Sequence, residues 1–236
     1  MMKTDCVPTL PTEVIIQGQA LTSAEILTVA RHYAPVSLGS ESLARINAAR
    51  RVIDRMADEG QKVYGVTTGF GHLSRVRIPR EQLTELQHNL LRSHSAGVGE
   101  PLSEDVTRAM MLLLAASLAR GNSGVRVDVV ELLLGMLNAR LYPVIPSRGS
   151  VGASGDLAPL AHLGIVLIGE GEVNYRGERV TGNAALAQAG LTPLHLQAKE
   201  GLALINGTHL MEASAILALA DAQALVRVAE VACAMS

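Results

Sequence analysis

The sequence predicts a mainly α-helical fold, in which an α-rich N-terminal domain with short β elements leads into a bundle of long helices. Hydrophobic residues make up 48% of the 236 residues, but aromatic residues only 2%, with no tryptophan and one phenylalanine. Aromatic side chains usually supply much of a core, so Leu, Ala, Val, Ile and Met must fill this one, which is typical of packed helices. Apolar residues also recur at helical spacing along most of the chain. We place the domain boundary between residues 1–196 and residues 197–236.

Charge, cysteine content and hydropathy exclude several classes of protein. A net charge of −2 gives no electrostatic reason to bind nucleic acid or an anionic membrane. The two cysteines, Cys6 and Cys233, lie near opposite ends and cannot form a disulfide framework, which fits a reducing compartment. The longest apolar stretch, residues 109–119, is too short to span a bilayer, and residues 1–10 contain no secretory signal. We therefore expect a cytoplasmic protein.

The first elements are a short strand and two helices. Residues 14–16 form the strand, and Thr22 or Ser23 begins the first helix, with Glu25 in its first turn. Ser40 or Ser42 opens a longer helix that ends at Gly60. Its helical spacing puts these residues on one apolar face: Leu43, Ile46, Val52, Ile53 and Met56. Most of its charged residues fall on another face: Arg45, Arg50, Arg51 and Asp54.

Helices then dominate the rest of the chain. A glycine-rich loop over residues 64–71 is too irregular for a helix or strand, and the helical segments that follow are 80–95, 103–120 and 125–140. Pro143 and Pro146 bracket an extended stretch, and alternation around Arg176-Gly177 predicts a hairpin.

Two further helical segments follow from the same pattern. Residues 156–168 form a buried helix, with Pro159 tolerable in its first turn. Residues 197–235 have helical propensity almost to the last residue, where no glycine or proline ends the pattern. A long helix that is hydrophobic on most faces needs partners. Either other subunits supply them, or the sequence is truncated.

The most informative segment is the loop of residues 149–160, which contains Ala153-Ser154-Gly155. Glycine lets the backbone approach itself closely. If the Gly155 nitrogen attacks the Ala153 carbonyl carbon, a five-membered ring closes. Loss of water there, and loss of the Ser154 hydroxyl as water, leaves a methylene conjugated with a carbonyl. That group is an electrophile that no ordinary side chain supplies, although an isolated triplet of this kind is usually a plain turn.

The word Ala-Ser-Gly-Asp-Leu-Ala-Pro-Leu, residues 153–160, resembles the signature of the aromatic amino acid ammonia-lyase and aminomutase family. The resemblance implies the fumarase/aspartase-like helical fold. It also implies that Ala153, Ser154 and Gly155 become the prosthetic group methylidene-imidazolone (MIO), with no metal and no dissociable cofactor. Asp156 would assist ring closure. A helix N-terminal aspartate is the simpler interpretation of Asp156, and both can hold.

Tyr64 begins Tyr-Gly-Val-Thr-Thr-Gly-Phe-Gly, which resembles a second family signature that ends at Gly71. A free tyrosine, with a pKa near 10, is a poor base at neutral pH. It needs a nearby cation, dipole or hydrogen-bond donor to act as one. The resemblance implies that Tyr64 removes the β-proton of the substrate and that Gly71 lies at the substrate. Without the family words, Tyr64 would be a packed loop residue.

Two polar residues complete the predicted site. Asn206, in Glu-Gly-Leu-Ala-Leu-Ile-Asn-Gly-Thr, resembles a third family word, which implies a place beside MIO and the substrate amine. His94, in Ser-His-Ser-Ala-Gly-Val-Gly, resembles a stretch of histidine ammonia-lyases that faces the substrate ring, with Ser95 in place of an alanine. Each residue also has a purely structural alternative. Asn206 could be a core amide that is hydrogen-bonded to backbone, and His94 could be a structural histidine whose hydrogen bonds are satisfied within the protein. His209 departs from the glutamine common at its position, and no histidines show the spacing of metal ligands.

The resemblance covers the chain from about Val14 to its end and aligns with the N-terminal half of a family enzyme. It implies conversion of L-histidine to trans-urocanate and ammonia, in a homotetramer with shared active sites. The alternatives are a phenylalanine or tyrosine ammonia-lyase, or an aminomutase that returns ammonia to the β-carbon. A different class of alternative is an inactive N-terminal fragment that serves only folding or assembly.

Overall fold

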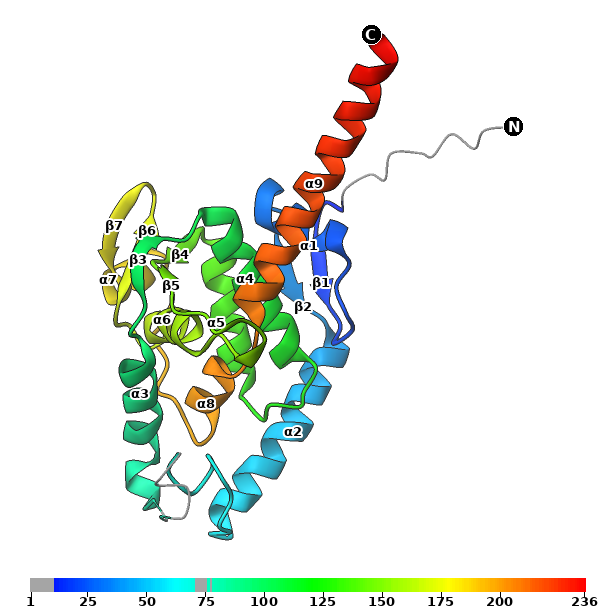
Figure 1. Ribbon diagram of the computed structural model, residues 1–236. Helices are drawn as coiled ribbons and strands as arrows, with labels where there is room; N and C mark the ends of the chain where they lie inside the picture. The colour runs from blue at the N-terminus through cyan, green and yellow to red at the C-terminus, as the bar shows by residue number, and fades with distance from the viewer. Residues whose placement is uncertain (1–10, 71–75, 77) are drawn as a thin grey trace.

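The computed structural model describes residues 11–70, 76 and 78–236, and it is mainly helical (Figure 1). The α-helices are α1 (Ser23–His32), α2 (Ser40–Asp58), α3 (Leu83–His94), α4 (Glu104–Ala119), α5 (Val127–Asn138), α6 (Leu157–Leu167), α7 (Gly182–Gln188), α8 (Glu200–Ile205) and α9 (His209–Met235). Short 3-10 turns are η2 (Arg80–Gln82) and η3 (Gly152–Ser154). The strands are β1 (Val14–Ile16), β2 (Val36–Leu38), β3 (Val98–Pro101), β4 (Leu141–Pro143), β5 (Pro146–Arg148), β6 (Glu172–Tyr175) and β7 (Glu178–Thr181).

The predicted strand at 14–16 is confirmed, and its partner is a strand that the sequence pattern did not reveal. β1 pairs in parallel with β2, with Val14 opposite Val36 and Ile16 opposite Leu38. Between them, Thr22 caps α1: its hydroxyl accepts from the Glu25 amide while the Glu25 side chain accepts from the Thr22 amide. This reciprocal pair satisfies two backbone donors that the helix leaves free.

α2 departs in two ways from its predicted form. Gly39, rather than Ser40 or Ser42, occupies the N-cap, without a side-chain cap. The predicted apolar face is also wrong in part, because Val52 is exposed and Arg50 is buried. Tertiary hydrogen bonds to the carbonyl oxygens of Gly124 and Ala198 draw the Arg50 guanidinium inward. Helical spacing alone does not carry that information.

α4 is the centre of the core. It packs against α1, α5 and the first part of α9 (Figure 1). Its buried side chains are almost all aliphatic or methionine, and they include Met110, Met111, Leu112, Leu114 and Leu118. The prediction of an aromatic-poor helical core is therefore confirmed.

Arg108 is the exception in this core, because it lies on α4 with only 1% of its surface exposed. Its guanidinium donates to the carbonyl oxygens of Val29 and Ala30, in the last turn of α1, and to the Tyr142 hydroxyl. The ring of Tyr33 lies under the guanidinium, 4.4 Å from its centroid. Helix C-termini carry partial negative charge, so the end of α1 compensates a cation that has no ion pair among the described residues.

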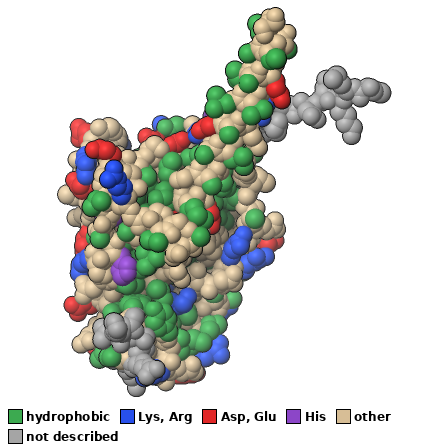
Figure 2. Space-filling view, in the orientation of Figure 1, with side chains coloured by type: hydrophobic (Ala, Val, Ile, Leu, Met, Phe, Trp, Pro, Cys, Tyr) green, Lys and Arg blue, Asp and Glu red, His purple; other side chains and the backbone are tan. Residues whose placement is uncertain are grey.

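The predicted helix over 197–235 is broken. α8 ends at Ile205, and α9 begins at His209, with the loop Asn206–Thr208 between them. The first part of α9 packs against α4, but its second part projects from the body, and Figure 2 shows apolar side chains along it. The large exposed residues there are Leu219, Leu225, Val226, Val228, Val231 and Met235. Among the described helices, none is long and apolar enough to cross a membrane.

Candidate active site

The Ala153-Ser154-Gly155 triplet lies in a tight turn between β5 and α6. Ala153 and Ser154 are exposed, whereas Gly155 is buried. The Ser154 amide donates to the Val151 carbonyl oxygen at 3.2 Å, and the Gly155 amide donates to that of Gly152 at 3.0 Å. Gly155 has φ = 127°, which strains any other residue, and an added Cβ would lie 2.8 Å from the Leu157 side chain. The turn therefore presents Ser154 outward and requires glycine at position 155.

Asp156 anchors this turn to the start of α9. Its side chain is fully buried, and Oδ2 accepts from the amides of Leu210 at 2.8 Å and Met211 at 3.0 Å. Oδ1 accepts from the Ser150 hydroxyl, and the Asp156 amide donates to the Gly207 carbonyl oxygen at 2.8 Å. Asp156 stands at the N-cap position of α6 but makes no side-chain cap there. The simpler interpretation of Asp156 is thus corrected in one respect, since the helix that its carboxylate caps is α9.

Asn206 lies next to the triplet because of this anchor. It follows α8 directly, is exposed, and its side chain makes no hydrogen bond to another described residue. The neighbouring Gly207 carbonyl oxygen is the acceptor for the Asp156 amide. The structure therefore brings the triplet and the Asn206–Gly207 loop together, and leaves the Asn206 amide free for a ligand. The alternative of a core amide bonded to backbone is not what the described residues show.

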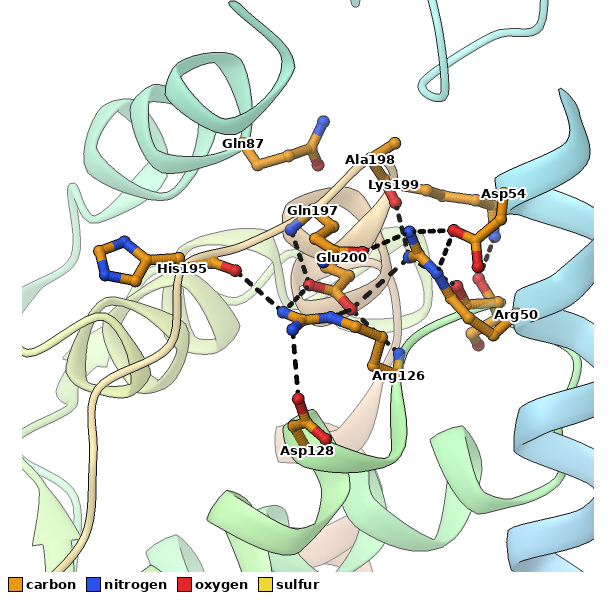
Figure 3. Close-up of polar contacts among 12 residues, drawn as sticks. Arg50, Asp54, Gln87, Arg126, Asp128, His195, Gln197, Ala198, Lys199 and Glu200 are labelled. Carbon is orange, nitrogen blue, oxygen red and sulfur yellow. Dashed lines mark hydrogen bonds and ion pairs between the residues drawn. The ribbon is translucent and has the colours of Figure 1, made fainter. Parts of the chain in front are cut away.

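A buried ion cluster fixes the other end of α8 (Figure 3). The Glu200 carboxylate has no exposed surface, and it accepts from Arg126 Nε and Nη2, both at 2.9 Å. The amides of Arg126 and Gln197 donate to it as well, and Arg50 Nη1 lies 3.6 Å from it. Such bidentate contacts fix geometry as well as charge. The cluster ties α8 to the start of α5 and to α2.

Tyr64 lies on the glycine-rich loop and is 55% exposed. Its ring meets Phe70 edge to face, with the centroids 6.1 Å apart. The loop touches α8, because a Cβ on Gly65 would lie 2.4 Å from the Leu202 side chain. No hydrogen bond or ring contact between described residues joins Tyr64 to Ser154 directly. Gly71 lies outside the described residues.

His94 ends α3, which packs against α6 and α8. Its Nδ1 lies 2.9 Å from the Leu90 carbonyl oxygen. Nδ1 also lies 3.1 Å from the Ser93 hydroxyl. In the neutral tautomer whose Nδ1–H donates to the Leu90 carbonyl oxygen, Nε2 presents a lone pair. His94 can therefore accept a hydrogen bond from a ligand N–H. Among the described residues it makes no hydrogen bond to Tyr64 or Ser154.

His162, on α6, holds the segment that follows His94. The Gly97 amide donates to His162 Nε2 at 3.1 Å, so this nitrogen must be unprotonated. Burial lowers the pKa of His162, and it also lowers the pKa of His88 and His209. His209 is buried against Gly207, and its Nδ1 has no hydrogen-bond partner among the described residues.

Because the pKa values of these buried histidines are lowered, we expect the protein to lose stability on the acid side of neutrality. The folded-state pKa values lie below 6.5, the ordinary value that the unfolded chain retains. Below that pH the unfolded chain binds more protons, so the free energy of unfolding falls as the pH falls through 6.5 and is unaffected above it. Urea unfolding between about pH 7.5 and pH 5 measures the slope. We expect His162→Gln to have a flatter slope than the wild type, and equal slopes for the two proteins would contradict the assignment.

No group of three or more His, Cys, Asp or Glu side chains in the described part of the chain has the arrangement of a metal site. Sequence reasoning did not single out Ser150, Glu200 or Arg126 as contributors to the site. Glu200 stood within the third family word, and a charged residue at the start of an apolar helix was the available signal. The hydrogen-bond partners of Glu200 come from distant segments, so no local sequence pattern could identify them.

Comparison with known proteins places this geometry in a family. The family model for "Aromatic amino acid lyase" matches residues 21–236. The chain is 47% identical over 224 residues to a histidine ammonia-lyase of Alkaliphilus metalliredigens, covering 95% of this chain and 44% of that relative. It is 52% identical over 222 residues to a histidine ammonia-lyase of Deinococcus radiodurans, covering 94% and 42%. The chain thus spans a little under half the length of these relatives.

Solved structures agree on the fold. Histidine ammonia-lyase from Trypanosoma cruzi superposes with a TM-score of 0.87 and 41% identity, covering 93% of this chain and 42% of that one. Tyrosine aminomutase from Streptomyces globisporus has a TM-score of 0.81 and 41% identity, covering 87% and 38%. The predicted fold class is therefore confirmed, and the chain belongs to the aromatic amino acid lyase family.

Proposed function

We propose that this chain is the N-terminal part of a histidine ammonia-lyase, which eliminates ammonia from L-histidine to give trans-urocanate. The observation that carries the proposal is the Ala153-Ser154-Gly155 turn, anchored through Asp156 to the loop that bears Asn206. The curated relatives support the substrate, since histidine ammonia-lyases are 47% and 52% identical to this chain.

MIO formed from the triplet would supply an electrophile for the substrate amine. The residues fit that group, because Ser154 faces outward and position 155 accepts only glycine. Tyr64 removes the β-proton, and Asn206 stabilises the developing charge with its free amide. His94 accepts a hydrogen bond from the imidazole of the substrate at Nε2. Gly71 lies at the substrate in this proposal. The group is made from the chain itself, so the proposal includes no metal and no dissociable cofactor.

Intact mass and product analysis test the proposal. Ring closure gives a mass deficit of two water molecules, and the unmodified mass would contradict the cofactor assignment. Assays for urocanate, cinnamate, coumarate and β-amino acids then separate histidine, phenylalanine and tyrosine ammonia-lyases from aminomutases. The aminomutase alternative has support from the 41% identity to a tyrosine aminomutase. Production of β-amino acid instead of urocanate would favour it.

Tyr64→Phe should keep the ring and lose turnover. Removal of a general base lowers the rate by about 10²–10⁴-fold, and the exposed side chain gives no reason to expect unfolding. The measurement is urocanate formation in the whole enzyme, with the mass deficit as the check on ring formation. Tyr33→Phe is the matched control, on a tyrosine at the end of α1. Wild-type turnover by Tyr64→Phe would remove Tyr64 as the base.

Assembly is the second part of the proposal. The exposed apolar side chains on the second part of α9 need a cover, and copies of the chain in a homotetramer would supply it. The boundary between residues 1–196 and 197–236, and a cytoplasmic location, belong to the proposal as well.

The chain spans 42% to 44% of the curated relatives. The alternative from another class is that it acts by itself only as a folding or assembly module. Light scattering and a urocanate assay on this chain distinguish the cases. A tetramer without turnover supports the module, and turnover excludes it.

A further inference from the structure

We propose that closure of the Ala153-Ser154-Gly155 ring depends on the docking of the first turn of α9, and that Asp156 makes this connection. The inference rests on the proposed function, because it concerns how the ring forms. Asp156 is held to α9 by both its side chain and its backbone: Oδ2 accepts from Leu210 and Met211, and its amide donates to Gly207. Its other carboxylate oxygen accepts from Ser150, on the far side of the triplet.

The dependence is mutual. The first amides of a helix have no acceptor within the helix, and Thr208, at the N-cap of α9, supplies no side-chain cap. The Thr208 hydroxyl instead donates to Glu212 at 2.8 Å. The carboxylate that serves α9 comes from 54 residues earlier in the chain. Conversely, Asp156 depends on α9. Its side chain has no exposed surface, and without α9 it lacks two of its hydrogen-bond donors, which is costly for a buried carboxylate.

Ring closure requires a rearrangement within the turn. A bond forms between the Gly155 nitrogen and the Ala153 carbonyl carbon. The first water leaves with the Ala153 oxygen and the amide protons of Gly155 and Ser154; the second takes the Ser154 hydroxyl and its α-proton. Those two amides donate to Gly152 and Val151 in the structure, so both hydrogen bonds must break.

The ends of the turn must stay fixed while its middle moves. The Val151 amide donates to the Gly155 carbonyl oxygen at 3.0 Å, and the Ser150 hydroxyl accepts from the Gly152 amide at 3.1 Å. Ser150 and the α9 amides then fix Asp156, directly after the reacting nitrogen. Ser150 and the amides of Leu210 and Met211 are therefore positioning groups. Ring closure follows docking of α9, so the ring marks chains in which that helix is seated.

Met211→Pro tests this coupling. It removes one of the two α9 amides, and proline is tolerated in the first turn of a helix, where that amide has no intrahelical partner. Met211→Ala is the matched control, since the side chain is 39% exposed. Ser150→Ala removes the contact on the other carboxylate oxygen. The readout is the fraction of freshly synthesised full chain that shows the deficit of two waters at successive times.

We expect the rate of ring closure to fall at least about ten-fold in Met211→Pro and in Ser150→Ala. Each variant loses one hydrogen bond to the charged Asp156 carboxylate, and a loss of that kind corresponds to about this factor. Met211→Ala should match the wild type. Circular dichroism reports whether each variant is folded. If Met211→Pro is not, an ester in place of the Met211 amide, which removes the same N–H without the proline ring, decides. Closure of the folded variants at the wild-type rate would overturn the coupling. Absence of the deficit in the wild type would instead overturn the proposed ring.

Discussion

Ser154→Ala is expected to abolish both the near-ultraviolet absorbance of the ring and all measurable turnover of the whole enzyme. Alanine has no hydroxyl to leave as water, so no methylene can form, and no other side chain offers a comparable electrophile. Ser154 is exposed in a turn whose hydrogen bonds are made by backbone atoms. The substitution should therefore leave the free energy of unfolding within about 0.5 kcal/mol of the wild-type value.

The measurements are the difference spectrum, the intact mass and urocanate formation. Ser117→Ala, at an exposed serine on α4, is the matched control and should behave as wild type in all three. An unchanged spectrum in Ser154→Ala would contradict the assignment of the triplet. Retained turnover with a lost spectrum would mean that the reaction does not depend on the ring.

Glu200→Gln is expected to have the largest effect on stability. Glu200 is fully buried between two arginines, Arg126 in bidentate contact and Arg50 at 3.6 Å. Removing one partner of a buried ion pair costs about 3–5 kcal/mol, because it leaves the other charge without compensation. Glutamine keeps the size of the side chain, so the loss reports the charge and not a cavity.

Denaturant or thermal unfolding measures this loss. Glu178→Gln is the matched control on an exposed glutamate of β7, where a change within about 0.5 kcal/mol is expected. Equal midpoints for the two variants would show that the cluster contributes nothing. A lost mass deficit in a folded Glu200→Gln would add that the cluster positions the segment from α8 to α9.

Local sequence patterns identified most of the helices, but not the places where tertiary contacts override periodicity. Thr22 with Glu25, and the Arg176-Gly177 hairpin, are local signals, and the structure has both elements. Arg50 was assigned to the polar face of its helix, because periodicity cannot anticipate a buried acceptor set from residues 124 and 198. The prediction of one unbroken helix over 197–235 is wrong for the same reason. The chain turns at Asn206–Thr208 so that the Gly207 carbonyl oxygen can meet Asp156.

The candidate site shows the same division. Four family-like words named Tyr64, His94, Ser154 and Asn206, and the role expected of each is what the resemblance to the family implies. Asp156 was singled out for its place beside Gly155, but its partners could not be read from the sequence. They are amides on another helix and the hydroxyl of Ser150.

By itself, the sequence determined the helical class, the aliphatic core and the triplet, because these depend on residue type and short-range spacing. The tertiary structure alone decided which helix Asp156 caps, how Glu200 is neutralised and where the last helix is interrupted. Each of those depends on groups that approach from distant segments to satisfy a buried charge or a free amide. The Ala153-Ser154-Gly155 triplet can be recognised from the sequence alone, whereas its attachment to α9 through Asp156 exists only in the folded structure.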